Sequence, residues 1–86
     1  MIKETEVIAT FHDYDFSPYR LPMIVIYDRP IDCPTKFVAR LFDLETPTPY
    51  AAIANTLDDV RKQLPMRFTR LDAFESDDPV IVEVWI

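Results

Sequence analysis

Short segments of this chain alternate between apolar and polar residues, which is the pattern of half-buried β-strands. One segment, MIVIYDR, is instead apolar at consecutive positions, which favours a central strand that is covered on both faces. In KFVARLFD, three apolar residues at alternate positions would lie on one face: Phe37, Ala39 and Leu41. The pattern predicts strands at 5–12, 23–29, 36–43, 50–54 and 79–86, and a weaker one at 66–71.

The segment IANTLDDVRKQLP predicts one short helix over residues 56–64. Asn55 or Thr56 can cap its first turn by accepting a hydrogen bond from a backbone N–H that has no partner within the helix. Pro65 ends it, because the residue before a proline avoids helical angles. Three residues at helical spacing give it one apolar stripe: Leu57, Val60 and Leu64. A helix of this length needs a sheet to pack against.

These elements predict an α+β fold, with a mostly antiparallel sheet of four to six strands and the helix of about 56–64 on one face. We expect one domain over residues 1–86, in which residues 1–22 form an N-terminal arm. Eight prolines mark the turns, for example the one expected at 44–49, and the chain has no glycine. Glycine-rich phosphate loops and the dinucleotide-binding fingerprint are therefore excluded.

The second face of the predicted sheet has two interpretations. Its candidate residues are Val25, Tyr27, Val38, Phe42 and Trp85. Either this face stays exposed and forms a homodimer through the sheet, or the aromatic residues of the arm cover it. Those aromatic residues are Phe11, Tyr14, Phe16 and Tyr19. Glu83 is the one charge in the last strand, and we expect it to face solvent or a sheet edge.

Composition and charge narrow the classes of function. The net charge of −6 opposes binding to the nucleic-acid backbone, and no apolar run approaches the roughly 20 residues of a membrane span. The first residues are polar and acidic, unlike a signal peptide. Cys33 is the single cysteine, so the chain has no internal disulfide, which favours a cytoplasmic location. We expect no direct contact with nucleic acid or membrane.

The sequence contains no strong catalytic or metal-binding signature. His12 and Cys33 are the only residues of their types, and a thiol–imidazole pair needs them to be neighbours in the fold. Asp13 and Asp15 beside His12 offer carboxylate and imidazole ligands, but metal sites usually collect three or four ligands. We therefore predict no enzyme activity, no catalytic residue, no cofactor and no metal site.

Charges are distributed unevenly near the C-terminus. The segment 72–78 is acidic, and it follows a basic stretch that contains Arg61, Lys62, Arg67 and Arg70. Such an arrangement suits either a bipolar docking surface or an ordinary solvated surface. The expected partner-binding residues are Asp72, Glu75, Asp77, Asp78, Arg67 and Arg70, with Tyr27 and Trp85 as contact aromatics.

Residues 23–86 resemble the HicB-type antitoxin domain in the order of their elements. The likeness lies in Phe42, Asp43 and Leu44 and in Thr56, Leu57, Asp58 and Asp59. MIVIYDRP corresponds to the first strand of that domain and VIVEVWI to the last. This chain departs from the family in lacking its proline–glycine turn and its C-terminal DNA-binding segment, and in having residues 1–22 in addition. The resemblance implies a non-catalytic, partly RNase-H-like sheet module that binds and blocks a protein partner.

Two functions remain under consideration. The first is a small, acidic, non-enzymatic protein-binding module of antitoxin or inhibitor type, whose partner is basic or itself binds nucleic acid. The alternative is an acidic mimic of nucleic acid that inhibits a nuclease or defence complex, as phages and mobile elements encode. Both hypotheses make a protein the partner.

Overall fold

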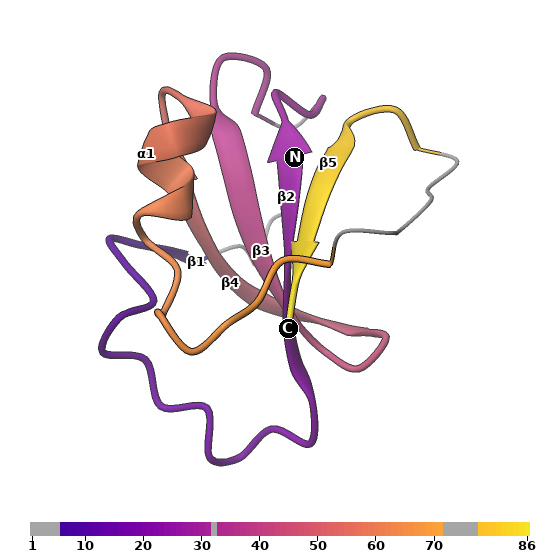
Figure 1. The fold of residues 1–86 in the computed structure, drawn as a ribbon. Helices are drawn as coiled ribbons and strands as arrows, with labels where there is room; N and C mark the ends of the chain where they lie inside the picture. Colours follow the sequence, from indigo (N-terminus) through magenta and orange to yellow (C-terminus); the bar gives the residue numbers. More distant parts are fainter. Residues whose placement is uncertain (1–5, 32, 72–77) are drawn as a thin grey trace.

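The computed structural model describes residues 6–31, 33–71 and 78–86, which form a five-stranded sheet with one helix (Figure 1). The strands lie in the order β1-β4-β3-β2-β5. In chain order the elements are β1 (Glu6–Ile8), β2 (Pro22–Asp28), β3 (Phe37–Asp43), β4 (Thr46–Ala54), α1 (Leu57–Arg61) and β5 (Ile81–Trp85). All neighbours pair antiparallel except β1, which runs parallel to β4. The predicted α+β class and the mostly antiparallel sheet are confirmed.

The first strand is much shorter than the predicted 5–12. β1 ends at Ile8, and the chain then leaves the sheet to cover the end of the helix. The Phe11 N–H donates to the Gln63 carbonyl at 2.8 Å, and the Thr10 hydroxyl donates to the same carbonyl at 3.3 Å. This satisfies a carbonyl that the helix end leaves without an internal partner, so the polar end of α1 determines where the strand stops.

The fourth strand begins earlier than the predicted 50–54. The segment 44–49 was expected to be a turn, but β4 starts at Thr46, and only Leu44 and Glu45 connect it to β3. Prolines belong on a strand edge, where no neighbour needs their missing N–H. On that side β1 pairs only with residues Tyr50, Ala51 and Ala52. Two prolines therefore fit into the free beginning of β4.

The helix occurs where the sequence predicts it, but its regular part is only five residues long. Thr56 is the N-cap, and its hydroxyl accepts from the Asp59 N–H at 3.1 Å. Val60 and Leu64 are buried against the sheet and Leu57 is half-buried, as the stripe predicts. The part of the chain that the structure covers contains no helical segment with the length and apolar character needed to cross a bilayer.

The core lies between one face of the sheet and a layer made of α1 and the loop after β1 (Figure 1). Phe11 and Phe16 from this loop are buried in the same cluster as Ile24, Leu41 and Val60. The arm's aromatic residues therefore cover the helix side of the sheet and not its second face. Their rings pack closely, for example Phe16 against Phe68 with centroids 5.2 Å apart.

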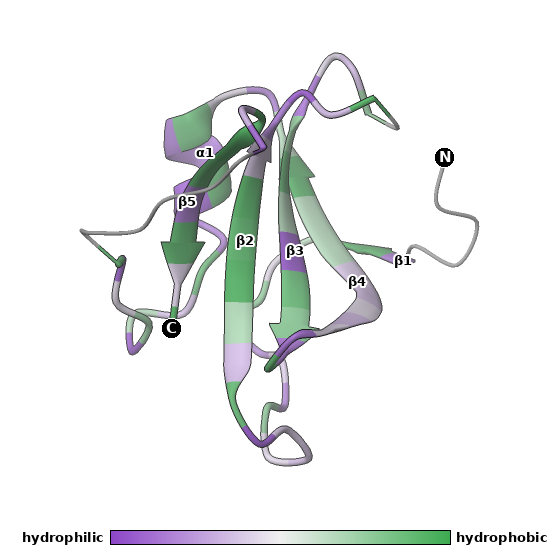
Figure 2. Ribbon diagram, turned by 90° about the vertical axis from the view of Figure 1, so that its right-hand side faces the viewer, coloured by the Kyte–Doolittle hydropathy of each residue, from purple (hydrophilic) through white to green (hydrophobic). Residues whose placement is uncertain are grey.

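The second face of the sheet has no helix on it among the described residues (Figure 2). Val38 is buried there, and Val25, Tyr27 and Phe42 are half-buried. Trp85 was wrongly predicted for this face: it stands opposite Ile24 in the sheet and packs on the core side.

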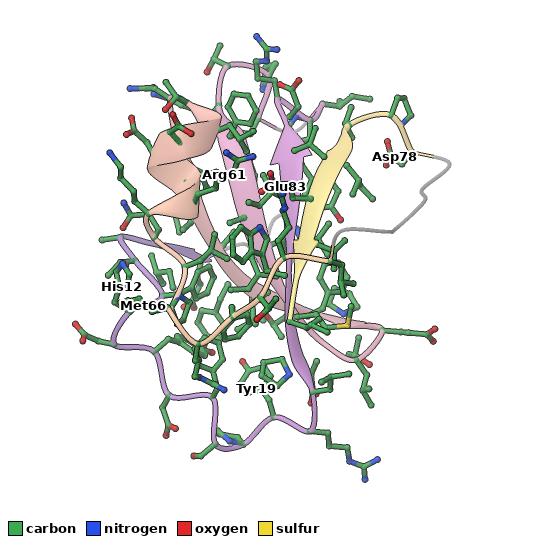
Figure 3. The ribbon with its side chains drawn as sticks, viewed as in Figure 1. His12, Tyr19, Arg61, Met66, Asp78 and Glu83 are labelled. Atoms are coloured by element: carbon green, nitrogen blue, oxygen red, sulfur yellow. The ribbon has the colours of Figure 1, made fainter. Side chains whose placement is uncertain are left out.

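Glu83 is buried, which contradicts the expectation that it faces solvent or an edge. Only 5% of its surface is exposed, because it stands opposite Ile26 on the core face of β5. The Arg61 side chain reaches it from the helix, and Nε lies 3.1 and 3.0 Å from its two oxygens (Figure 3). Trp85 Nε1 donates to Oε1 at 3.0 Å, and Arg70 Nη1 lies 3.4 Å from Oε2. A buried carboxylate needs such partners.

The weak strand prediction for 66–71 is met only by a short bridge to β5. Arg70 pairs with Trp85 as an isolated antiparallel bridge. The Thr69 N–H donates to the Ile86 carbonyl at 2.6 Å, and the Leu71 N–H to the Val84 carbonyl at 2.9 Å. These bonds cover the C-terminal half of the β5 edge, which otherwise would be open to another strand.

Replacing Glu83 with glutamine should lower the free energy of unfolding by about 2–3 kcal/mol, because it removes the buried charged partner of the Arg61 guanidinium and leaves only the 3.4 Å contact with exposed Asp58. Urea unfolding at neutral pH measures this change. Glu45→Gln is the matched control: it removes the same charge from an exposed turn, and should alter stability by less than about 0.5 kcal/mol.

The effect of Glu83→Gln should depend on pH. Burial raises the pKa of Glu83, but hydrogen bonds from Arg61 and Trp85 outweigh burial and hold that pKa below its ordinary value. The ionised form therefore stabilises the fold above the unfolded-state pKa of about 4.3, and this contribution is lost as the pH falls through the lower folded-state pKa. An unchanged difference between wild type and variant from pH 7 down to about pH 2 would contradict this assignment.

Two described residues other than glycine have a positive φ: Arg29 at 46°, and Leu44 at 56° in the turn between β3 and β4. Left-handed angles cost an ordinary L-residue about 1–2 kcal/mol, and asparagine tolerates them better. Leu44→Asn should therefore raise the free energy of unfolding by about 0.5–1 kcal/mol in urea titrations. Glu45→Asn, at the next position of the same turn, should give no gain, and an equal gain there would refute the explanation.

Candidate functional site

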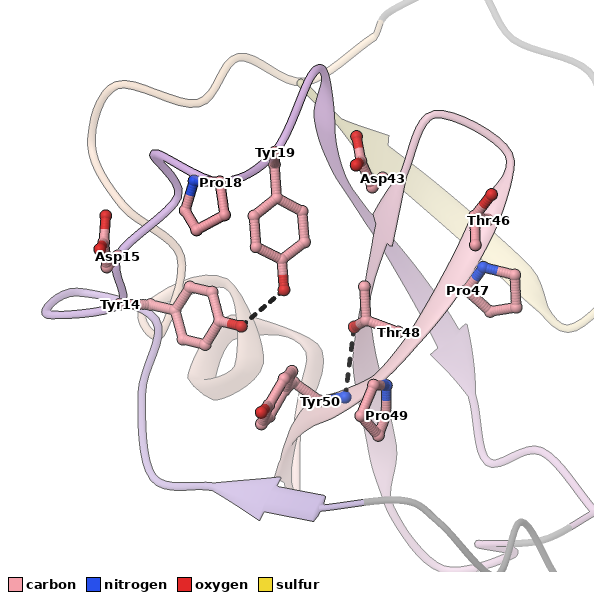
Figure 4. Close-up of a pocket in the computed structure, with 10 residues that line it drawn as sticks. All are labelled: Tyr14, Asp15, Pro18, Tyr19, Asp43, Thr46, Pro47, Thr48, Pro49 and Tyr50. Carbon is pink, nitrogen blue, oxygen red and sulfur yellow. Dashed lines mark hydrogen bonds between the residues drawn. The ribbon is translucent and has the colours of Figure 1, made fainter.

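An open groove of about 520 Å³ lies between the loop of residues 14–19 and the start of the β3–β4 hairpin (Figure 4). We call it the tyrosine–proline groove. Its ring-bearing lining residues are Tyr14, Tyr19, Tyr50, Pro18, Pro47 and Pro49, and its polar lining residues are Asp15, Asp43, Thr46 and Thr48. Neither lysine nor arginine lines it.

The loop that forms one wall is held to the sheet by Asp43 at the end of β3. Asp43 Oδ1 accepts hydrogen bonds from the backbone N–H groups of both Arg20 and Leu21, each at 3.0 Å. Within the loop, the Tyr19 N–H donates to the Phe16 carbonyl at 3.0 Å. Buried Phe16 anchors the inner side of the same loop. The buried Phe16 ring therefore holds the inner side of this loop, and the Asp43 carboxylate holds its C-terminal end.

The tyrosines of the groove pack against one another. The ring centroid of Tyr14 lies 5.4 Å from that of Tyr50 and 6.0 Å from that of Tyr19. The hydroxyls of Tyr14 and Tyr19 share a hydrogen bond of 2.6 Å. Burial, with the hydrogen bond to Tyr19 as the next cause, raises the pKa of Tyr14 far above its usual value. Tyr14 therefore stays neutral at physiological pH.

The opposite wall is the first half of β4. The Thr48 hydroxyl donates to the Leu41 carbonyl at 2.8 Å and accepts from the Tyr50 N–H at 3.2 Å. These bonds occur where the pairing of β3 with β4 is irregular. Pro47 and Pro49 have no N–H to offer a ligand. This wall therefore presents mainly rings and methyl groups to the groove.

Two carboxylates give the groove a negative charge. Asp15 accepts from the Ser17 N–H at 2.9 Å, and the backbone and hydroxyl of Ser17 lower its pKa. Asp15 is therefore ionised at neutral pH. Asp43 is the second acidic side chain of the lining, and the backbone N–H groups of Arg20 and Leu21 bond its Oδ1. An apolar groove with negative ends attracts an apolar ligand that carries positive charge.

The acidic part of the predicted binding surface cannot be placed as a whole. Asp72, Glu75 and Asp77 lie outside the described residues. Asp78 is exposed, and its side chain accepts a hydrogen bond from the Val80 N–H at 3.1 Å. This is the bond of a local turn.

The basic and aromatic residues of that predicted surface lie on different parts of the fold. The Arg67 guanidinium lies over the rings of Phe16 and Phe68, 5.1 Å from each centroid. Arg70 and Trp85 both contact Glu83, and Tyr27 is half-buried on the second sheet face. None of these residues lines the tyrosine–proline groove.

Sequence reasoning missed this groove because one wall comes from the predicted N-terminal arm and the other from the predicted turn at 44–49 and the strands beside it. The signal was present in YDFSPY and TPTPY, which place three tyrosines and three prolines in two short stretches. Such residues supply large rings at a low cost in conformational entropy, which suits contact surfaces.

His12 and Cys33 occupy separate structural positions. A ring nitrogen of His12 bonds the Lys62 carbonyl at the end of α1, and the Cys33 N–H donates to the Pro30 carbonyl in the β2–β3 connection at 2.9 Å. Over the residues with described positions, no group of three His, Cys, Asp or Glu side chains is arranged to hold a metal ion.

Comparison with protein-family models, with curated proteins and with solved structures finds no match to this chain.

Removing the Asp43 carboxylate should loosen the wall of the groove. In Asp43→Ala, the backbone amides of Arg20 and Leu21 lose their hydrogen-bond acceptor. We expect their hydrogen exchange to become about tenfold faster or more, because the local stability falls by about 1.4 kcal/mol. Asp43→Asn keeps an oxygen acceptor and should exchange at nearly the wild-type rate. Unchanged exchange in the alanine variant would show that Asp43 does not hold the loop.

Proposed function

We propose that this protein is a small, non-enzymatic protein-binding module of antitoxin or inhibitor type, which holds a segment of a protein partner in the tyrosine–proline groove. The observation that carries the proposal is the composition of this groove. Its lining is mostly tyrosine and proline rings, it contains two carboxyl side chains and no basic one, and its Thr48 hydroxyl already bonds the protein itself. Such a groove suits contact with a ligand better than catalysis.

The protonation states in the groove support binding over catalysis. A general acid or base works best with a pKa near the working pH. Tyr14 has a raised pKa and Asp15 a lowered one, so that neither changes its protonation state near neutral pH. Their pKa values are moved away from neutrality, in the direction that suits a fixed contact surface.

The net charge of −6 supports a basic partner, because complementary charge accelerates association and orients the two proteins. The resemblance of residues 23–86 to the HicB-type antitoxin domain supports the inhibitor type of module. In that reading, the partner is a protein whose activity is blocked when this chain binds it.

The proposal predicts that a charge reversal in the groove abolishes partner binding and that the same reversal nearby does not. Tagged wild type, Asp15→Lys and Asp13→Lys are used to capture proteins from a lysate of the source organism, with washes at low and high salt, and bound proteins are identified by mass spectrometry. Asp13 is exposed in the same loop but does not line the groove. We expect a stoichiometric partner on wild type and Asp13→Lys that is lost from Asp15→Lys.

Equal capture by all three proteins would place the binding surface elsewhere and refute the groove. A specific turnover that one substitution abolishes would refute the non-enzymatic assignment. A nucleic-acid-binding partner that leaves at high salt from every variant would instead support the acidic mimic of nucleic acid, because that contact depends on many charges at once.

A further inference from the structure

The spacing and kind of rings in the tyrosine–proline groove restrict what can bind there. Tyr14, Tyr19 and Tyr50 form a connected set with centroids 5.4–6.0 Å apart. Proline rings from both walls complete the lining (Figure 4). Grooves of this kind, lined by aromatic rings, recognise extended ligands whose own rings pack against the lining rings. The rings therefore favour an extended peptide that itself carries prolines.

The β4 wall argues against a ligand that adds to the sheet as a strand. Strand addition needs a row of backbone N–H and carbonyl groups on the free edge. In the part of β4 that β1 does not pair, alternate residues are Pro47 and Pro49, which lack the N–H. A polyproline II segment makes no ladder of hydrogen bonds, so this wall does not impair its binding.

The paired hydroxyls of Tyr14 and Tyr19 leave one hydrogen-bond donor for such a segment. Tyr14 and Tyr19 share a single hydrogen bond with each other, which uses one of their two hydroxyl protons. The other proton remains to be donated to a ligand carbonyl. The backbone carbonyls of a polyproline II helix are solvated and need a donor when they are buried.

Charge specifies one further feature of the ligand. Asp15 is exposed at one wall, and Asp43 lies at the end of β3, with no basic side chain in the lining to neutralise them. A positive side chain beside the prolines would meet this field. Arginine fits better than lysine, because its planar guanidinium can bond a carboxylate and also stack on a tyrosine ring.

From these observations we infer that the groove takes a proline-rich segment in the polyproline II conformation, with an arginine next to the prolines, from a partner protein. This inference rests on the proposed function and specifies the chemistry of the partner at that site. The preformed conformation of such a segment reduces the entropy lost on binding, which suits a shallow groove.

Fluorescence anisotropy of labelled peptides tests the inference directly. The probe is a short oligoproline peptide that ends in arginine, and its controls are the same peptide ending in glutamate and a serine–glycine peptide ending in arginine. We expect the first to bind wild type about tenfold more tightly than either control. Equal binding of the glutamate peptide, equal binding of the serine–glycine peptide or no binding of the oligoproline–arginine peptide would each overturn the inference.

Variants assign the binding to the groove. Asp15→Lys should weaken the oligoproline–arginine peptide about tenfold or more, and Asp13→Lys by less than about twofold. Pro49→Ala should weaken it several-fold, whereas Pro34→Ala, in the β2–β3 connection at the other end of the sheet, should leave it unchanged. Circular dichroism confirms that each variant is folded. Equal affinities within either pair would overturn the assignment to the groove.

The two proposals can fail separately. If the captured partner depends on Asp15 while the oligoproline–arginine peptide does not bind, only the inferred ligand chemistry is wrong. If partner capture is indifferent to Asp15 and the peptide does not bind, both the proposed function of the groove and this inference are wrong. If the peptide binds and partner capture does not depend on Asp15, the inferred ligand chemistry stands and the role of the groove in partner binding is wrong.

Discussion

The short helix leaves most of one sheet face to be covered by something else. Five residues of helix are about 7.5 Å long, whereas five strands extend about 19 Å across the sheet. The loop after β1 supplies the missing cover with Phe11 and Phe16, which are as buried as the residues of the central strands. The stability of the core therefore depends on a loop. Because this loop has no regular ladder of backbone hydrogen bonds, other hydrogen bonds must hold its two ends in place as anchors.

Those anchors determine the shape of the candidate site. At one end, the Phe11 N–H bonds the carbonyl of Gln63 at the end of the helix, and at the other the carboxylate of Asp43 holds the N–H groups of Arg20 and Leu21. Between the anchors the loop lies beside the start of β4, and its Tyr14 packs against Tyr50 in the lining of the groove. The groove is thus a consequence of how the core is completed.

The fold and its strands could be predicted to the extent that they depend on local patterns. The apolar pattern located three of the five strands closely, β2, β3 and β5, and the cap, stripe and proline located the helix. Glu83 could not be predicted, because its partners come from α1 and from residue 70, and a lone charge in a strand pattern resembles a solvent-facing residue. Its burial also fixes the register of β5, since a slip by one residue would move the carboxylate away from Arg61. The groove escaped prediction for the same reason, because its two walls are about 30 residues apart in the chain and meet only through the core.

The prolines of β4 have two effects: they hinder the pairing of other strands with this sheet edge, and they line the proposed binding groove. A strand edge with free N–H groups invites pairing with other chains, and Pro47 and Pro49 remove two of these groups where β1 does not reach. The rings of these two prolines also lie in the lining of the groove, together with the tyrosines of the loop. A ligand at this edge must therefore be recognised by ring packing and charge, because the backbone pattern of a β-strand has few groups left to pair with. The choice of residues that makes this edge resist strand pairing is also what gives the groove its chemical selectivity.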